Sequence, residues 1–183
     1  MGATFDLTDL RVEPATCESG TDRRASARRL GIGRLPPGPG LLRAAQSIAD
    51  RCPPTPGRVH GLGEFVDRQV HAALAAALGP EQRLRLRDRF EWYACRGAGF
   101  HTDAHYAGVL FGAWCVAGPP REIVFARAGL RAPAAIGDFA VFDPFEPHAV
   151  LDPGQPRYDR DHFSAAAPSV FIGFEIELDA EAR

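Results

Sequence analysis

Two amino-acid types are missing from this chain of 183 residues: it has no lysine and no asparagine, and its 21 basic residues are all arginine. Without lysine, Schiff-base catalysis and a phosphate-binding loop built on lysine are excluded, and without asparagine there is no N-glycosylation site. An excess of positive charge is lacking too, because the formal net charge is −2. Nucleic acids and anionic membranes attract a strongly basic surface, so we favour neither as a partner.

Closely spaced cysteines and long apolar runs are also absent. The four cysteines, Cys17, Cys52, Cys95 and Cys115, include no C-x-x-C pair, which argues against a thiolate zinc site and against a dense disulfide framework. The N-terminal residues have no basic flank leading into an apolar run, and the longest apolar stretch, Tyr106–Pro120, is short and interrupted by glycine and proline. We therefore expect reduced thiols, no membrane segment and a cytoplasmic location.

What remains is an ordinary globular composition, with 45% hydrophobic and 24% charged residues in a length that suits one domain over residues 1–183. Residues 1–89 read as an N-terminal arm with support helices. Ala3–Val12 is a candidate strand, and Glu13–Gly40, rich in proline, glycine and arginine, is either a substrate lid or an irregular surface loop. Helical spacing of apolar residues predicts helices over Leu41–Arg51 and Leu62–Leu78.

From Phe90 the sequence changes to short β-rich runs separated by glycine and proline. The last of them, Ser169–Leu178, alternates two sets of side chains as a half-buried strand does. This spacing predicts a mainly β fold, a double-sheeted barrel over residues 90–178 with the N-terminal helices packed outside. The predicted strands are Phe90–Cys95, Gly99–Tyr106, Val109–Val116, Glu122–Ala126, Asp138–Phe142, His148–Leu151 and Ser169–Leu178.

The triplet His101-Thr102-Asp103 and a later His148 are the candidate metal ligands. Residues two apart in a strand share a face, so His101 and Asp103 can point together into a barrel, where His148 from another strand would complete the set. Two histidines and one carboxylate suit a non-haem Fe(II) that keeps open positions, and zinc also fits these ligands. The alternative is that all three are ordinary polar residues of strands and loops.

Two segments around these residues are similar to one enzyme family. The first is Trp92–Asp103, in which a tyrosine, a glycine-containing bend and an aromatic residue precede H-x-D. The second is Gly137-Asp138-Phe139-Ala140-Val141-Phe142, followed by Pro147–Val150. Over about Phe90–Leu178 the chain resembles the iron(II)- and 2-oxoglutarate-dependent dioxygenases, in particular the prolyl-hydroxylase-like branch with its double-stranded β-helix (jelly-roll) core.

This resemblance implies that His101, Asp103 and His148 ligate Fe(II) and that Tyr93 contacts the co-substrate 2-oxoglutarate. The family also uses an arginine for the distal carboxylate of 2-oxoglutarate, and Arg157, nine residues after His148, has the expected spacing. A guanidinium suits that role because it can donate two charge-assisted hydrogen bonds. Because the last predicted strand, Ser169–Leu178, contains no basic residue, other arginines stay open as the anchor: Arg96, Arg121 and Arg127.

The first functional hypothesis is therefore an oxygenase that uses Fe(II), 2-oxoglutarate and O2 to hydroxylate a C–H bond, releasing succinate and CO2. The presence of Asp103 favours hydroxylation or a related oxidation over halogenation, since the carboxylate leaves no vacant site for a halide. The second hypothesis is a cupin-like metal-dependent enzyme or metal-binding domain that does not use 2-oxoglutarate. The substrate is left open among small molecules, amino acids and peptide side chains, and so is the oligomeric state.

Overall fold

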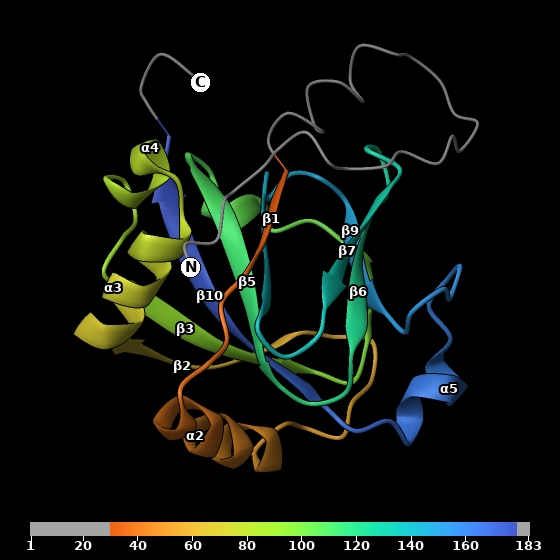
Figure 1. Ribbon diagram of the computed structural model, residues 1–183. Helices are drawn as coiled ribbons and strands as arrows, with labels where there is room; N and C mark the ends of the chain where they lie inside the picture. The colour runs from red at the N-terminus through yellow and green to blue at the C-terminus, as the bar shows by residue number, and fades with distance from the viewer. Residues whose placement is uncertain (1–29, 179–183) are drawn as a thin grey trace.

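The computed structural model describes residues 30–178, except for the side chains of Glu81 and Ala104. Figure 1 shows two β-sheets facing each other, with most of the helices on the outer side of one sheet and a short helix near residue 160 on the outer side of the other. The strands are β1 (Gly31–Arg34), β2 (His60–Val66), β3 (Arg89–Cys95), β4 (Ala98–His101), β5 (Val109–Ala117), β6 (Arg121–Phe125), β7 (Leu130–Ala134), β8 (Asp138–Phe142), β9 (His148–Leu151) and β10 (Ser169–Glu177). The helices are α2 (Pro39–Asp50), α3 (Arg68–Ala77), α4 (Pro80–Arg83), the 3₁₀ turn η1 (Ala104–Tyr106) and α5 (Arg160–Ser164).

The strand order is that of a jelly roll. One sheet has six strands in the order β1-β8-β5-β10-β3-β2, and the other has four in the order β4-β9-β6-β7. All the pairings within the sheets are antiparallel, and from β3 onward the chain passes back and forth between the sheets. This topology confirms the mainly β, double-stranded β-helix fold expected from the sequence.

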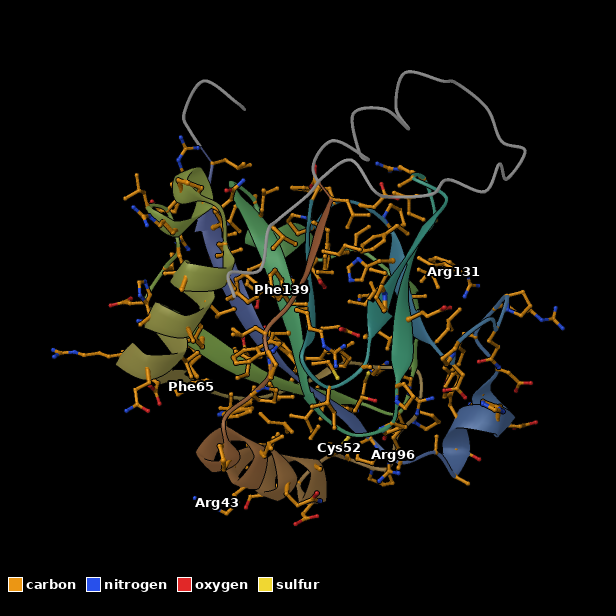
Figure 2. All side chains as sticks on the ribbon, in the orientation of Figure 1. Arg43, Cys52, Phe65, Arg96, Arg131 and Phe139 are labelled. Carbon is orange, nitrogen blue, oxygen red and sulfur yellow. The ribbon has the colours of Figure 1, made fainter. Side chains whose placement is uncertain are left out.

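The core has two layers, which follow from the alternation along β10. Phe171 packs between the two sheets, whereas Ile172 and Phe174 face the helices. Both sets are almost completely buried, as the pattern in the sequence predicts. In Figure 2 the labelled side chains Cys52 and Phe139 belong to the layer between the helices and the six-stranded sheet.

Helices α2 and α3 cover the outer face of the six-stranded sheet. Pro39 lies in the first turn of α2, where its missing N–H costs nothing, and Ala45 and Ile48 are buried on the inner side of this helix. The side chain of Asp67 caps α3 by accepting hydrogen bonds from the N–H groups of Gln69 and Val70. The predicted outside position of the N-terminal helices is confirmed.

Three predicted elements need correction. The helix expected over Leu62–Leu78 begins only at Arg68, because Leu62–Val66 belongs to β2, which pairs with β3. The segment expected to be irregular, Glu13–Gly40, contains β1 in its described part, while its residues before Leu30 and the candidate strand Ala3–Val12 lie outside the described residues. The strand expected over Gly99–Tyr106 ends at His101, and η1 follows.

Strand β7, like β1 and β2, is not among the strands predicted from the sequence. Its residues, Leu-Arg-Ala-Pro-Ala, include a proline that has no N–H for a sheet hydrogen bond. The strand lies at the edge of the four-stranded sheet, where a proline is tolerated. Within residues 30–178, no helix is long and apolar enough to cross a membrane.

Candidate metal centre and its cavity

Two histidines of the candidate centre are direct neighbours across two strands. His101 is the last residue of β4 and His148 the first of β9, and their Cα atoms are partners in the antiparallel ladder. Partners in a ladder project to the same face of a sheet. Their rings accordingly lie together on the inner side of the four-stranded sheet, with 4.4 Å between the ring centroids.

Asp103 reaches the same place from a turn rather than from a strand. Its backbone N–H donates to the carbonyl of Pro144 at 2.8 Å, which fixes the end of β4 to the β8–β9 connection. The carboxylate lies 3.4 Å from Nε2 of His148 and 4.0 Å from Nε2 of His101. Asp103 lies beside the two histidines, as expected from the sequence. The expected reason was wrong, because β4 ends at His101 and Asp103 therefore does not share a strand face with it.

The donor atoms of the three residues all lie within 4.8 Å of one another. Both imidazoles have their second nitrogen occupied: Nδ1 of His101 donates to the carbonyl of Gly99 at 2.8 Å, and Nδ1 of His148 donates to that of Glu146 at 2.9 Å. A carbonyl only accepts, so these bonds place the proton on Nδ1 and leave Nε2 free to bind a metal.

Electrostatics favours the ionisation states that a metal needs. Burial, the largest cause, would raise the pKa of Asp103, but the hydrogen bond and charge of His148, with a smaller contribution from His101, outweigh it and hold that pKa below its usual value. Burial and the neighbouring His148 lower the pKa of His101. These shifts favour an anionic Asp103 beside a neutral His101, and a carboxylate anion and a neutral imidazole are the forms that coordinate metal cations.

These donors fit a mononuclear metal ion. Two imidazoles and one carboxylate on one side of the ion leave the opposite positions open, an arrangement that suits Fe(II) in non-haem oxygenases. Zinc accepts the same ligand types. The three donors therefore favour Fe(II) and are also compatible with zinc. Within the part of the chain that the structure describes, these are the residues whose donor atoms cluster in this way.

Glu146 supports the centre and was missed by the sequence analysis. It is 4% exposed, and its Oε1 accepts hydrogen bonds from the backbone N–H groups of Arg127 at 2.6 Å and Ala128 at 3.0 Å. Its own carbonyl orients His148. Glu146 therefore ties the β6–β7 turn to the segment that carries His148, and the signal for it in the sequence was its place two residues before a candidate ligand.

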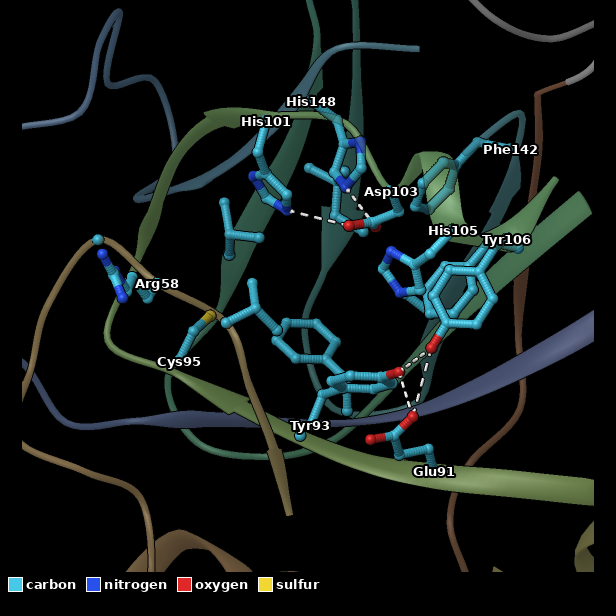
Figure 3. Close-up of a pocket in the computed structure, with 18 of the residues that line it drawn as sticks. Arg58, Glu91, Tyr93, Cys95, His101, Asp103, His105, Tyr106, Phe142 and His148 are labelled. Carbon is cyan, nitrogen blue, oxygen red and sulfur yellow. Dashed lines mark hydrogen bonds and ion pairs between the residues drawn. The ribbon is translucent and has the colours of Figure 1, made fainter. Parts of the chain in front are cut away.

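The three residues open onto a cavity of about 710 Å³ between the two sheets. Figure 3 shows the histidines and Asp103 at one side of it. Much of the remaining wall is apolar, with Phe111, Ile123, Phe142 and Phe171 among its residues. Such a wall offers apolar contacts to a ligand in the space beside the candidate metal.

Tyr93, expected from the sequence as a co-substrate contact, lines this cavity and belongs to a cluster with Tyr106 and Glu91. The Tyr93 hydroxyl donates to Oε2 of Glu91 at 2.5 Å and contacts the Tyr106 hydroxyl, which lies 3.3 Å from the same carboxylate oxygen. Burial, together with the hydrogen bond to Glu91, raises the pKa of Tyr93, so this phenol stays protonated. His105 lines the cavity beside this cluster, with its ring 4.1 Å from that of Tyr106.

Arg157, the carboxylate anchor expected from the sequence, is exposed in the connection between β9 and α5 and is not among the residues that line the cavity. Neither are the other arginines that the sequence left open. Arg96 and Arg121 donate to the carbonyls of Ala166 and Ala167, and Arg121 is also paired with Asp152. The side chain of Arg127 lies at an exposed position outside the cavity.

One arginine does line the cavity among the described residues: Arg58, in the loop before β2. Figure 3 shows its guanidinium on the His101 side. No described residue forms an ion pair with it. Nothing in the sequence singled it out, because it reaches the cavity only through the backbone contacts of the neighbouring Gly57 with Gly97 and Ala98.

Comparisons with known proteins identify the fold. No protein-family model matches the sequence, and no curated protein matches it. Among solved structures, a Pseudomonas putida prolyl-4-hydroxylase is similar at a TM-score of 0.51 and 14% identity, over 86% of this chain and 96% of that one. Two others have lower scores: the non-heme alpha ketoglutarate dependent epimerase SnoN from nogalamycin biosynthesis (TM-score 0.46, 15% identity, 87% and 82% covered) and a predicted oxalate decarboxylase from Thermotoga maritima (TM-score 0.38, 14% identity, 67% and 83% covered). At such identities, the likeness to the hydroxylase shows a shared jelly-roll fold.

Proposed function

We propose that the protein is an oxygenase dependent on Fe(II) and 2-oxoglutarate, which hydroxylates a C–H bond of a small molecule, an amino acid or a peptide side chain. The observation that carries this proposal is the convergence of His101, Asp103 and His148 at the wall of a cavity, with both imidazoles turned so that Nε2 faces the carboxylate. When bound, iron and 2-oxoglutarate supply the O2-dependent oxidation, with release of succinate and CO2.

The residues of the chain have separate tasks in this reaction. Asp103 contributes a negative charge that two neutral imidazoles alone would lack, and it favours hydroxylation because its carboxylate occupies the position that a halide would take. The carbonyls of Gly99 and Glu146 hold the two rings in place. Phe142 packs against His148, with 4.7 Å between ring centroids, and helps to hold this ring in place.

The distal carboxylate of 2-oxoglutarate needs a cation, and Arg58 is the candidate. It lines the cavity, no described residue is paired with it, and a planar guanidinium can hold a carboxylate through two hydrogen bonds. The order of the elements explains why Arg157 is the weaker candidate. A turn and helix α5 separate β9 from β10, so the residue nine positions after His148 lies in a connection instead of on the last strand.

A second candidate function is supported by one observation. The inward positions of β10 include Phe171 and Gly173, so this strand offers the cavity no basic group. A cupin-like enzyme that uses the metal without 2-oxoglutarate would need no basic group at this position. The two candidates differ in whether 2-oxoglutarate binds next to the metal.

The test is an anaerobic titration of the full chain with Fe(II) and 2-oxoglutarate, following the visible absorption band that arises when 2-oxoglutarate chelates iron. We expect a band that requires both components and disappears in Asp103→Ala. Arg58→Ala and Arg157→Ala form a matched pair, since both remove an exposed guanidinium. Arg58→Ala should raise the 2-oxoglutarate concentration at half-maximal signal by about tenfold or more, and Arg157→Ala should leave it unchanged.

Each other outcome has a definite meaning. Iron binding without the band would refute the use of 2-oxoglutarate and favour the cupin-like function. A band weakened by Arg157→Ala and not by Arg58→Ala would show that Arg157, and not Arg58, binds the distal carboxylate of 2-oxoglutarate. Absence of any metal binding would refute the centre itself.

A further inference from the structure

The charges that line the cavity are separated. Arg58 lies on the His101 side, and Glu91 of β3 lies at the opposite end. Glu64 of the adjacent strand β2 also lines the cavity. These glutamates are direct Cα partners in the ladder. Like charges in directly opposed positions destabilise a sheet, so a cation close to this pair would be stabilising.

Glu64 has a cation to balance it and Glu91 has none. Arg89 lies 3.2 Å from the carboxylate of Glu64, and the nearby Arg87 is paired with Glu175 and Glu177. Glu91 instead receives hydrogen bonds from two neutral tyrosines, Tyr93 and Tyr106. No arginine forms an ion pair with Glu91 in the part of the chain that the structure describes, so it leaves an uncompensated negative charge at this end of the cavity.

The two oxygens of Glu91 have different surroundings. Oε2 accepts from the two tyrosine hydroxyls, and Oε1 packs so closely against Gly61 that a Cβ atom there would lie 2.4 Å from it. A ligand at this end of the cavity therefore meets the two tyrosines together with Glu91, whose Oε2 is already engaged by both hydroxyl groups. Figure 3 shows the two hydroxyl groups converging on Glu91 below the metal donors.

An aromatic wall joins this cluster to the metal centre. The ring of Tyr106 lies 4.8 Å from that of Phe111, Phe111 lies 5.7 Å from Phe142, and Phe142 lies 4.7 Å from His148. Tyr93 also contacts Phe111, at 6.0 Å. A small molecule held at the tyrosines thus lies along a wall that ends at the candidate oxidation site.

We infer that the substrate of this site carries a methylated ammonium group, seated on the rings of Tyr93 and Tyr106 in front of Glu91. This inference rests on the proposed function only in calling the ligand a substrate. An alkylated cation suits the place because aromatic faces attract positive charge without needing an N–H donor, and the negative charge behind them adds to the attraction. A primary ammonium has three N–H groups that seek acceptors, whereas Oε2 of Glu91 already accepts from two tyrosine hydroxyls and Oε1 is crowded by Gly61.

The test compares choline with 3,3-dimethyl-1-butanol, in which carbon replaces the charged nitrogen, and with ethanolamine, which has a primary ammonium. Binding to the full chain is measured by saturation-transfer NMR and calorimetry, without added iron or 2-oxoglutarate. We expect choline to bind about tenfold more tightly than either comparison compound. The preference should fall to less than about twofold in Glu91→Gln and persist in Glu177→Gln, which removes an exposed carboxylate outside the cavity.

A second measurement uses the wild-type chain, so that the inference can be tested even if the Glu91→Gln variant misfolds. The chain has three tyrosines, and we expect magnetisation transfer from the choline methyl groups to the rings of Tyr93 and Tyr106 but not to that of Tyr158, which lies outside the cavity. Equal binding of choline and its neutral analogue, equal binding of ethanolamine, or transfer to Tyr158 alone would overturn the inference. Because no iron is used, loss of the metal centre and loss of the cation preference are separate results.

Discussion

Replacing Asp103 with alanine removes the only charged donor of the candidate centre, and its effect can be worked out for thermal unfolding. A metal that binds only the folded chain stabilises it by about 2.7 kcal/mol at a free concentration of about 100 times Kd. For a chain of this size, each kcal/mol raises Tm by about 2–4 °C, so the metal should raise Tm by about 5–10 °C. If the variant binds metal about a hundredfold more weakly, the same concentration gives about 0.4 kcal/mol, or about 1–2 °C.

The assay is anaerobic differential scanning calorimetry with and without Fe(II), on the wild-type chain, Asp103→Ala and Asp50→Ala. Asp50 lies at the exposed end of α2, so its variant should keep the full metal-dependent rise. The quantity compared is the rise in Tm for each protein, which removes any change in the metal-free Tm. An undiminished rise in Asp103→Ala would refute the assignment of this carboxylate as a ligand.

Three further predictions follow from the surroundings of the centre. Glu146→Ala leaves two backbone N–H groups without an acceptor, that of Ala128 buried and that of Arg127 partly buried, and should lower the free energy of unfolding in urea by about 1–3 kcal/mol. Glu146→Gln, which keeps an acceptor oxygen, should lose less. Gly173→Ala places a Cβ atom 2.4 Å from the Tyr93 ring and should cost about 1–3 kcal/mol and weaken choline binding, while Gly40→Ala, with nothing within 4 Å, should do neither. Burial and the nearby Glu91 raise the pKa of Tyr106 from 10.0 to about 12 against the opposing hydrogen bond of Tyr93, so its stabilising contribution is complete below pH 10 and is lost as the pH rises to about 12. Alkaline titration of tyrosinate absorbance, with chemical unfolding at each pH, would contradict this if Tyr106 ionised near its ordinary pKa.

Local sequence patterns were sufficient for most of the barrel. The alternation in Ser169–Leu178 correctly separates the side chains that face the second sheet from those that face the helices. Strand β2 was misread because its apolar residues, Leu62, Phe65 and Val66, continue the spacing of the helix that follows. What makes this segment a strand is its pairing with β3, a long-range interaction that no local pattern records.

The residues of the candidate site likewise include some that the sequence indicates and some that only the tertiary structure reveals. The H-x-D triplet and His148 stand out in the sequence because few residue types bind metals, and the structure brings them together. Arg58 and Glu91 carry no such signal, since an arginine in a loop and a glutamate in a strand are ordinary. Their positions in the cavity depend on how the segment before β3 packs against the barrel, which is decided by tertiary structure.

The pairing of β4 with β9 has a consequence for the order in which the protein matures. His101 and His148 are neighbours only in this ladder, and the four strands β5–β8 lie between them in the chain. A contact between residues so far apart in the sequence forms late in folding, because it requires the entropic cost of closing the intervening loop. An ion bound by these residues would therefore be captured by an already assembled barrel, and its binding would slow the opening of the barrel without speeding its formation. For a cell, metal supply would then govern the lifetime of the folded protein and leave its rate of synthesis and folding unchanged.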